Sequence, residues 1–241
     1  MSFLKSIIRR CRIMLLRWHA SSSPDMPIAG KILIIAPHPD DEVMGCGGLI
    51  QRLCEQGIPP HVVILTGGGQ SHSACCHLSE SVIKEERRSM ASQLLRKLGL
   101  PADHLHLLDF PDGSISPSHE EMNTLQNLVA EIQPDAVFIP HQGEGWPDHL
   151  VCRELVEKMP VLGAASIYEY CVWLWYYNVW NLDWKRANLL QMSKAEHAAK
   201  CRSVEAYTEK LAPCGKPWSG VLPKLLIWAC KWNKELYFRV R

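Results

Sequence analysis

The segment Pro37–Glu42 concentrates side chains that could do chemistry. It places one imidazole, His38, and three carboxyl groups, Asp40, Asp41 and Glu42, within five consecutive residues. Burying so much negative charge at one point is costly unless a cation offsets it. Histidine and carboxylate ligands suit zinc, which in catalytic sites takes three protein ligands and leaves a fourth position for water. The segment therefore predicts a metal centre, most simply of zinc, although other divalent ions fit such ligands.

A third ligand has to come from another part of the chain, and Pro147–Asp148–His149 is the natural source. His149 could coordinate the metal through one ring nitrogen while a backbone carbonyl or the adjacent Asp148 holds the other. A bound zinc ion lowers the pKa of water toward neutrality and polarises a carbonyl group. A carboxylate that does not bind the metal is then needed as the base, and either Asp40 or Glu42 could serve.

Both segments follow apolar runs that predict buried strands. Strands are expected at residues 31–36, 61–66, 104–108, 136–140 and 166–175, and helices at 45–56, 79–98, 122–132 and 193–210. This alternation favours an α/β, Rossmann-like fold with a mostly parallel sheet and helices on both faces. Since ligands bind beyond the carboxyl ends of such strands, we expect the chemistry in loops 37–42, 66–70, 109–113 and 141–149.

The composition narrows the function. The chain has 241 residues, 47% of them hydrophobic, which is enough for one sizeable core. Its 26 Lys and Arg nearly cancel its 25 Asp and Glu, so it lacks the basic footprint of a general nucleic-acid binder, and no nucleic-acid partner is expected. None of the ten cysteines has the C-x-x-C spacing of a structural zinc site, and a bond between the neighbours Cys75 and Cys76 would be strained. Reduced thiols in a cytoplasmic protein are the expectation.

The first residues form a basic and apolar segment. Residues 1–19 interleave apolar side chains with five Lys and Arg residues, and no run of about 20 apolar residues could span a bilayer. Two interpretations stay open: an amphipathic helix on an anionic membrane surface, at the inner face, or an ordinary helix packed on the domain. The similar stretch 218–232 could be a second membrane contact or the partner of this helix. Residues 20–30 have the composition of a linker, which leaves 31–241 for a catalytic domain.

The run Ala36–Glu42, followed by Gly45 and Gly47–Gly48, resembles the signature of the PIG-L/LmbE-like family of zinc-dependent N-acetylglucosaminyl deacetylases. Other landmarks of that family follow in order: Thr66 with the glycine after it, Arg87 ahead of Leu98–Gly99, Pro111–Asp112–Gly113, and Pro147–Asp148–His149. The similarity covers residues 31–149 well and the remainder loosely. A long loop motif with a matching distant Asp-His pair is a specific signal.

The resemblance implies roles for individual residues. It makes His38, Asp41 and His149 the zinc ligands, and Asp40 the general base that takes a proton from water as the water attacks an acetamide carbonyl. Glu42 then becomes a structural partner of the loop. The implied enzyme removes the N-acetyl group from an amino sugar like N-acetylglucosamine, including a lipid-linked or other glycan precursor.

Substrate contacts are implied as well. Arg87 matches a family arginine that contacts the sugar or phosphate portion, although Arg88 is the match if the register slips by one, and both could be surface charges. Asp112 is a candidate hydroxyl acceptor in what is also an ordinary turn. Tyr168 begins an aromatic stretch, residues 168–177, that could stack on a sugar or belong to the core.

One position departs from the family pattern. Many members have a histidine three residues before the last zinc ligand, where it helps to stabilise the oxyanion or to protonate the leaving group, and this chain has Trp146 there. An indole donates one hydrogen bond but is no acid at neutral pH. His141 and Glu144 lie in the same loop and could substitute.

Two other functions fit the sequence. The chain could be a metal-dependent amidase that acts on another amide conjugate. It could also be a catalytically impaired homologue that binds a sugar or nucleotide, as Trp146 and the glycines after the first strand suggest, although these do not have the G-x-G-x-x-G spacing. Among the histidines without a role, His72, just after Gly67–Gly69, is the strongest candidate for one.

Overall fold

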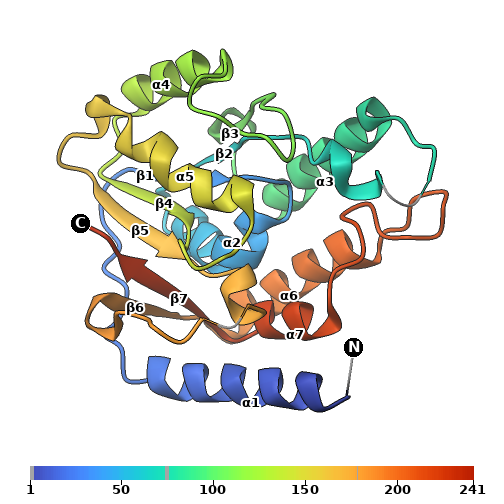
Figure 1. Ribbon diagram of the computed structural model, residues 1–241. Coiled ribbons are helices and arrows are strands. Elements are labelled where there is room, and N and C mark those ends of the chain that lie inside the picture. The colour runs from blue at the N-terminus through green and yellow to red at the C-terminus, as the bar shows by residue number, and fades with distance from the viewer. Residues whose placement is uncertain (1–2, 74–75, 178) are drawn as a thin grey trace.

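The computed structural model describes residues 3–73, 76–177 and 179–241, so Cys75 lies outside the described residues. A seven-stranded sheet with the order β3-β2-β1-β4-β5-β7-β6 forms its centre (Figure 1). The strands β1 to β5 pair in parallel, whereas β7 runs antiparallel to both of its neighbours. This confirms the predicted, mostly parallel sheet. The strands are β1 (Ile32–Ala36), β2 (His61–Ile64), β3 (Leu105–Leu107), β4 (Ala136–Pro140), β5 (Ser166–Tyr170), β6 (Ala187–Gln191) and β7 (Lys234–Arg239).

Helices cover both faces of this sheet, as predicted. The α-helices are α1 (Phe3–Ala20), α2 (Asp41–Glu55), α3 (Glu80–Lys97), α4 (Glu121–Ile132), α5 (Pro147–Glu157), α6 (Lys194–Glu209) and α7 (Lys224–Cys230). The side chains of α2, α3 and α6 share one core with Ile34 and Phe138, while those of α4 and α5 share another with Ile35 and Val137. Since both faces are covered, β1 and β4 are buried at every position.

Three boundaries near the loops of interest differ from the sequence expectations. The helix expected from Gly45 begins at Asp41, so two acidic residues stand in its first turn, where the helix dipole stabilises them. Helix α5 begins at Pro147 inside an expected loop, because proline suits a first helical position that needs no N–H. The strand expected to reach Trp175 ends at Tyr170 and gives way to a short 3-10 helix, η4 (Trp173–Trp175).

The antiparallel strands β6 and β7 and the helix α7 were not predicted. A buried ion pair ties this part to the rest of the domain: Lys200 Nζ of α6 lies 2.6 Å from Glu235 Oε1 of β7. The same carboxylate accepts hydrogen bonds from the backbone N–H groups of Gly48 and Leu49 in α2. Gly48 allows this approach, because a Cβ there would stand 2.3 Å from the Met192 sulfur. The glycines after the first strand therefore serve close packing.

Helix α1 lies along one side of the molecule, against β6 and α7 (Figure 1). Arg12 is buried and donates hydrogen bonds to the carbonyl oxygens of Leu174, Trp175 and Val179. Arg17 donates to carbonyl oxygens in α7 and lies 4.2 Å from the ring centre of Trp228. The stretch around α7 is thus a partner of the N-terminal helix, which was one of the two alternatives. Among the described residues, no helix has the length and apolar character needed to cross a membrane.

Candidate metal centre

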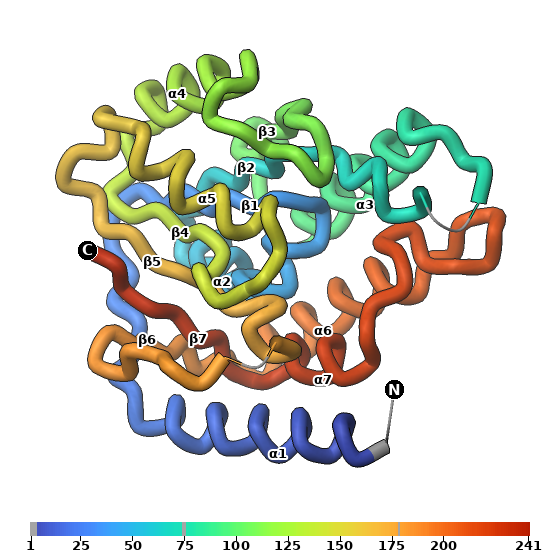
Figure 2. Tube along the Cα trace, in the orientation of Figure 1, coloured from blue at the N-terminus to red at the C-terminus, as the bar shows by residue number. Residues whose placement is uncertain are grey.

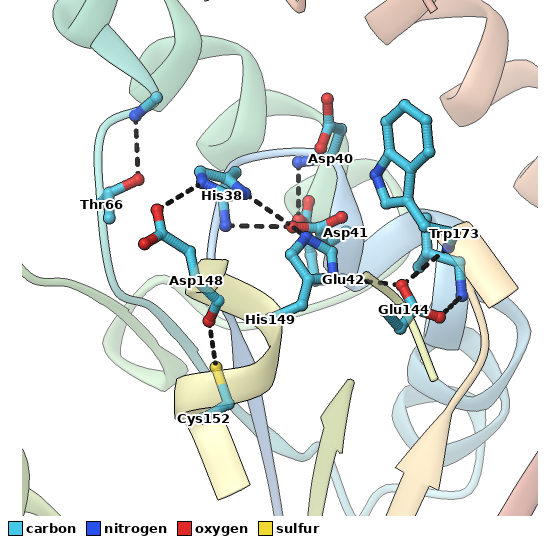
Figure 3. Close-up of polar contacts among 12 residues, drawn as sticks. His38, Asp40, Asp41, Glu42, Thr66, Glu144, Asp148, His149, Cys152 and Trp173 are labelled. Atoms are coloured by element: carbon cyan, nitrogen blue, oxygen red, sulfur yellow. Dashed lines mark hydrogen bonds and ion pairs between the residues drawn. The ribbon is translucent and has the colours of Figure 1, made fainter. Parts of the chain in front are cut away.

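The three side chains predicted as metal ligands converge at the carboxyl edge of the sheet (Figure 3). His38 follows β1 and Asp41 opens α2, while His149 lies in the first turn of α5, after the neighbouring strand β4. Asp41 Oδ2 lies 3.2 Å from His38 Nδ1 and 3.2 Å from His149 Nε2. One ligand atom from each residue lies within 4.8 Å of the others. The pairing of β1 with β4 therefore brings together the two ends of a site that the sequence separates.

A carboxylate stands behind each imidazole. His38 Nε2 lies 3.1 Å from Asp112 Oδ1 and 3.1 Å from Asp148 Oδ2, and His149 Nδ1 lies 3.1 Å from Glu144 Oε2. Such partners fix the ring orientation and raise the basicity of metal-binding histidines. The suggestion that Asp148 orients His149 is wrong, because neighbouring residues of a helix point about 100° apart. Asp148 orients His38 instead. His38, Asp112 and Asp148 also form a second group that could hold a metal through Nε2.

The electrostatics of this cluster favour positive charge. Burial on its own lowers the pKa of His149, but the charges of Asp41 and Glu144 outweigh it and raise that pKa to about 9. Burial likewise opposes the charge of Asp41, and His149 and His38 outweigh it, so the Asp41 pKa lies below its usual range. The pKa of His38 is raised, against the effect of burial, by its three carboxylate partners. The site stabilises either protonated rings or a cation in their place.

Asp40 sits beside the cluster in an unusual backbone conformation. Its φ of 134° lies in a region that side chains other than glycine rarely adopt, and such strain persists where the surroundings enforce it. Its backbone N–H donates to Glu42 Oε2 at 2.9 Å, and Arg87 Nη2 lies 3.1 Å from Asp40 Oδ2. Burial raises the pKa of Asp40 to about 8, with Arg87 opposing and Asp41 and Glu42 adding to the rise. A divalent cation at Asp41 would favour the ionised form of Asp40.

Glu42 holds the loop in place. It is fully buried, and its second oxygen accepts a hydrogen bond of 2.6 Å from the Tyr207 hydroxyl of α6. Glu42 is thus a structural partner of the loop, as expected, and Asp40 is the carboxylate left for proton transfer. Tyr207 was missed by the sequence analysis, because nothing local marks a helical tyrosine 165 residues away as its partner.

Arg87 is buried rather than a surface charge. Its Nη1 donates to the carbonyl oxygen of Gly68 at 3.0 Å, and its Nη2 donates to that of Pro39 at 2.7 Å as well as facing Asp40. Arg88 points elsewhere and donates to Leu108 and Asp109. Arg87 therefore joins the loop after β2 to the loop that carries Asp40, and its contact with a substrate stays a prediction.

Glu144 has a structural task that the sequence did not reveal. It has no exposed surface and accepts hydrogen bonds from the backbone N–H groups of Val172, Trp173 and Leu174, in addition to facing His149 (Figure 3). Because the N–H groups after Tyr170 bond to this carboxylate, they do not continue the sheet, and β5 ends at Tyr170. These contacts also leave no oxygen of Glu144 to replace the missing family histidine.

Two other residues predicted to contact the substrate or the transition state, His141 and Tyr168, are buried away from the cluster. His141 is buried with Nε2 at 3.5 Å from Glu169 Oε2, and burial together with the charge of Arg153 lowers its pKa to about 4. None of its described contacts is with the cluster. Tyr168 is only 4% exposed and stacks on Phe138 in the core, so the expectation that it contacts a sugar is not supported, and the core alternative describes it.

Trp146 is 44% exposed and lies directly before the helix that carries His149. Its ring packs edge to face on Trp173, with ring centres 5.4 Å apart. Trp173 in turn lies 6.0 Å from Tyr176 and 5.9 Å from Tyr177 between ring centres. These four rings form an aromatic group that Trp146 joins to the helix of the predicted ligand His149. Its other three members belong to the stretch that Tyr168 begins.

Comparisons with known proteins identify the family of the chain. The family model described as PIG-L, GlcNAc-PI de-N-acetylase, matches residues 33–159. Diacetylchitobiose deacetylase of Thermococcus kodakarensis is 30% identical over 126 residues, 49% of this chain and 45% of that protein. A probable N-acetyl-alpha-D-glucosaminyl L-malate deacetylase 2 of Bacillus cereus is 27% identical over 157 residues, 56% of this chain and 67% of that protein.

The fold is shared with solved structures. N,N'-diacetylchitobiose deacetylase of Pyrococcus horikoshii superposes with a TM-score of 0.59 at 23% sequence identity, over 86% of this chain and 79% of that one. The chain spans less than half the length of the Thermococcus relative. The matched part nevertheless contains both segments that form the cluster.

Proposed function

The chain belongs to the PIG-L family of de-N-acetylases, and on this premise we propose that it is a zinc-dependent hydrolase that removes the acetyl group from an N-acetylated amino sugar. The observation that carries the proposal is the convergence of His38, Asp41 and His149, each imidazole backed by a carboxylate. Two nitrogens and one oxygen match the ligand sets of catalytic zinc sites. When bound there, zinc would supply a Lewis acid and lower the pKa of a water molecule.

Asp40, Arg87 and Glu42 provide the proton transfer in the proposed reaction. Asp40, as the ionised carboxylate, accepts the proton of the attacking water, and Arg87 positions that carboxylate through Oδ2. The proton is then available for the nitrogen of the departing amine. Glu42 keeps the Asp40 backbone in its strained conformation, so that the base does not swing away during the reaction.

The aromatic group supports a sugar as the substrate. Trp146 directly precedes the helix that carries His149, and it packs on Trp173, whose backbone N–H donates to Glu144. Aromatic side chains offer large apolar faces with a polar edge. Such surfaces suit the apolar C–H faces of a pyranose ring. The indole N–H of Trp146 replaces the family histidine as a hydrogen-bond donor but not as an acid.

The test is an amine-release assay with the zinc-loaded protein. The panel contains N-acetylglucosamine, N,N'-diacetylchitobiose, N-acetylglucosaminyl conjugates and non-sugar acetamides such as N-acetylated amino acids. We expect release from the acetamido sugars, and strongly reduced release when the same sugars are given to Asp40→Asn. Release from the non-sugar amides alone would replace the proposal by the amidase alternative. A protein that binds zinc and sugar but releases no amine would be the impaired homologue.

The exposed face of α1 supports a membrane contact as an additional proposal. Leu4, Ile8, Leu15 and Trp18 are each more than half exposed, and Lys5 lies among them at the surface. An apolar face with basic neighbours binds anionic lipid surfaces. The full-length protein should therefore sediment with vesicles containing phosphatidylglycerol but not with pure phosphatidylcholine, and Leu15→Ser with Trp18→Ser should abolish this. Equal sedimentation of the double variant would contradict the contact.

A further inference from the structure

A third group of metal-ligating side chains lies apart from the candidate metal centre and has no role in the proposed reaction. It consists of His72, Cys76 and Cys214. His72 ends the short 3-10 helix η1 (Gly69–His72), and Cys76 follows four residues later. Cys214 comes from the segment between α6 and α7. Figures 1 and 2 show these two segments side by side, although 142 residues separate His72 from Cys214.

The distances within this group fit a tetrahedral zinc ion. Cys76 Sγ lies 3.6 Å and Cys214 Sγ lies 3.4 Å from the same atom, His72 Nδ1. Zinc bonds of about 2.0 Å to nitrogen and about 2.3 Å to sulfur at a tetrahedral angle place the two ligand atoms roughly 3.5 Å apart. The three ligand atoms all lie within 4.8 Å of one another. An ion bonded to these three atoms has a fourth position, which a solvent molecule can fill because Cys214 is exposed.

The tautomer of His72 leaves Nδ1 able to bind a metal. Its Nε2 lies 2.9 Å from the carbonyl oxygen of Pro217, which can only accept, so Nε2 carries the proton. In the neutral ring Nδ1 then has a single lone pair, and both sulfurs approach it. One metal ion can join this lone pair to two thiolates. A backbone carbonyl on the second nitrogen is also the usual support of a zinc-binding histidine.

The surroundings hold the ligands ready. Residues 211–217 form a turn closed by a β-bridge between Leu211 and Pro217, and Cys214 lies in the middle of this turn. Ser71 Oγ donates to the carbonyl oxygen of Trp218 at 3.1 Å, which joins this turn to η1 independently of the cysteines. His72 is 1% exposed, whereas Cys214 is exposed, so an ion can enter from solvent to a fixed histidine.

We propose that His72, Cys76 and Cys214 form a structural zinc site that fastens the segment after α6 to η1. Two thiolates and one imidazole select zinc among the common divalent ions. Each thiol releases its proton to solvent as its sulfur binds, so binding strengthens as the pH rises. The site fixes η1, whose Gln70 N–H donates to Asp112 Oδ2 at 2.7 Å, and Asp112 faces His38. It thereby stabilises one wall of the catalytic centre without touching a substrate.

Cobalt substitution tests this site separately from the proposed function. Full-length protein is loaded with Co²⁺ under reducing conditions, in the His149→Ala background where the catalytic cluster lacks a ligand. A sulfur-to-cobalt charge-transfer absorption in the near ultraviolet is expected only if thiolates bind the ion. Zinc content after desalting is measured in parallel and should fall by one equivalent per chain when Cys76→Ser and Cys214→Ser are combined.

Cys201→Ser is the matched control. Cys201 also lies four residues after a histidine, with its sulfur 3.4 Å from His197 Nε2, but it belongs to no group of three among the described residues. Loss of the absorption and of zinc in the Cys76/Cys214 variant, with both retained in Cys201→Ser, would support the proposal. The proposal fails if the absorption is absent, if it survives the double substitution, or if thiol titration finds Cys76 and Cys214 joined as a disulfide in the protein as isolated.

Discussion

The two clusters of metal-ligating residues are built from different ligands and in different places. His38, Asp41 and His149 offer nitrogen and oxygen at the carboxyl edge of the sheet, with both imidazoles backed by carboxylates. His72, Cys76 and Cys214 offer nitrogen and sulfur where two connecting segments meet, with the imidazole backed by a backbone carbonyl. Two imidazoles and a carboxylate are a ligand set of catalytic zinc sites, whereas thiolate ligands predominate in structural zinc sites. The ligand chemistry thus supports the catalytic role proposed for the first cluster and the structural role proposed for the other.

The largest effect is expected from removing a ligand of the first cluster. Asp41→Asn or His149→Ala should reduce amine release to the background rate and lower the zinc content by one equivalent, because two ligands do not retain a catalytic zinc ion. The thiolate absorption of the cobalt form should persist in both variants. If either substitution also removed that absorption, the two clusters would not be independent.

Asp40→Asn should leave zinc bound but lower kcat by about 10²–10⁴-fold, the usual contribution of a general base. Asparagine is suited to this position, since it tolerates positive φ better than most residues and keeps the shape of the side chain. Kinetics combined with metal analysis separate this variant from a ligand variant. Full activity would assign the base to another residue.

Asp112→Asn distinguishes the two sides of His38. With the metal on the Nδ1 side, Asp112 only supports the ring, and its loss should weaken zinc affinity by about 10–100-fold. Competition with a chromophoric chelator measures this change. Loss of one equivalent of zinc in Asp112→Asn, with its retention in Asp41→Asn, would place the ion on the Nε2 side, with Asp112 and Asp148 as ligands.

The thiolate cluster should affect stability more than catalysis. Combining Cys76→Ser with Cys214→Ser should lower the Tm of the zinc-loaded protein, by about 2–4 °C for each kcal/mol of lost binding energy. Calorimetry before and after chelation measures it. Chelation should lower the Tm of the double variant less than that of the wild type. An equal change in both proteins would contradict the structural role proposed for this site.

The smallest effect is expected at Trp146, where one substitution should change both kcat and KM. Trp146→His supplies an imidazole that can protonate the leaving amine, so kcat should rise by up to about tenfold. The same change removes an aromatic ring that packs on Trp173, so KM for an acetamido sugar should rise as well. Steady-state kinetics on one substrate separate the two constants. An unchanged kcat would show that this enzyme manages leaving-group protonation without a group at this position.

Much of the first cluster could be predicted because its signal is local. The run from His38 to Glu42 places the proposed base and two proposed ligands side by side after a buried strand, and parallel sheets gather such loops at one edge. The partner residues could not be predicted in the same way. Glu144 and Asp148 both precede His149 in the sequence, and nothing there shows which of them faces its ring. The start of α5 at Pro147 decides that Glu144 does.

The absence of C-x-x-C spacing had argued against a structural zinc site. The argument is valid for sites built within one short segment, but Cys214 approaches His72 from the far end of the chain.

The sequence by itself determined the fold class, the family and the residues that could bind a catalytic metal, because strand patterns and the composition of a single loop are short-range properties. The tertiary structure decided which carboxylate orients each histidine, that Arg87 holds a loop, that Tyr168 is core, and that the distant Cys214 approaches His72 beside Cys76. These depend on strand pairing and on how the segment after α6 returns to the sheet. Contacts between distant segments leave no periodic trace in the sequence, since their geometry is set only when the whole core has packed.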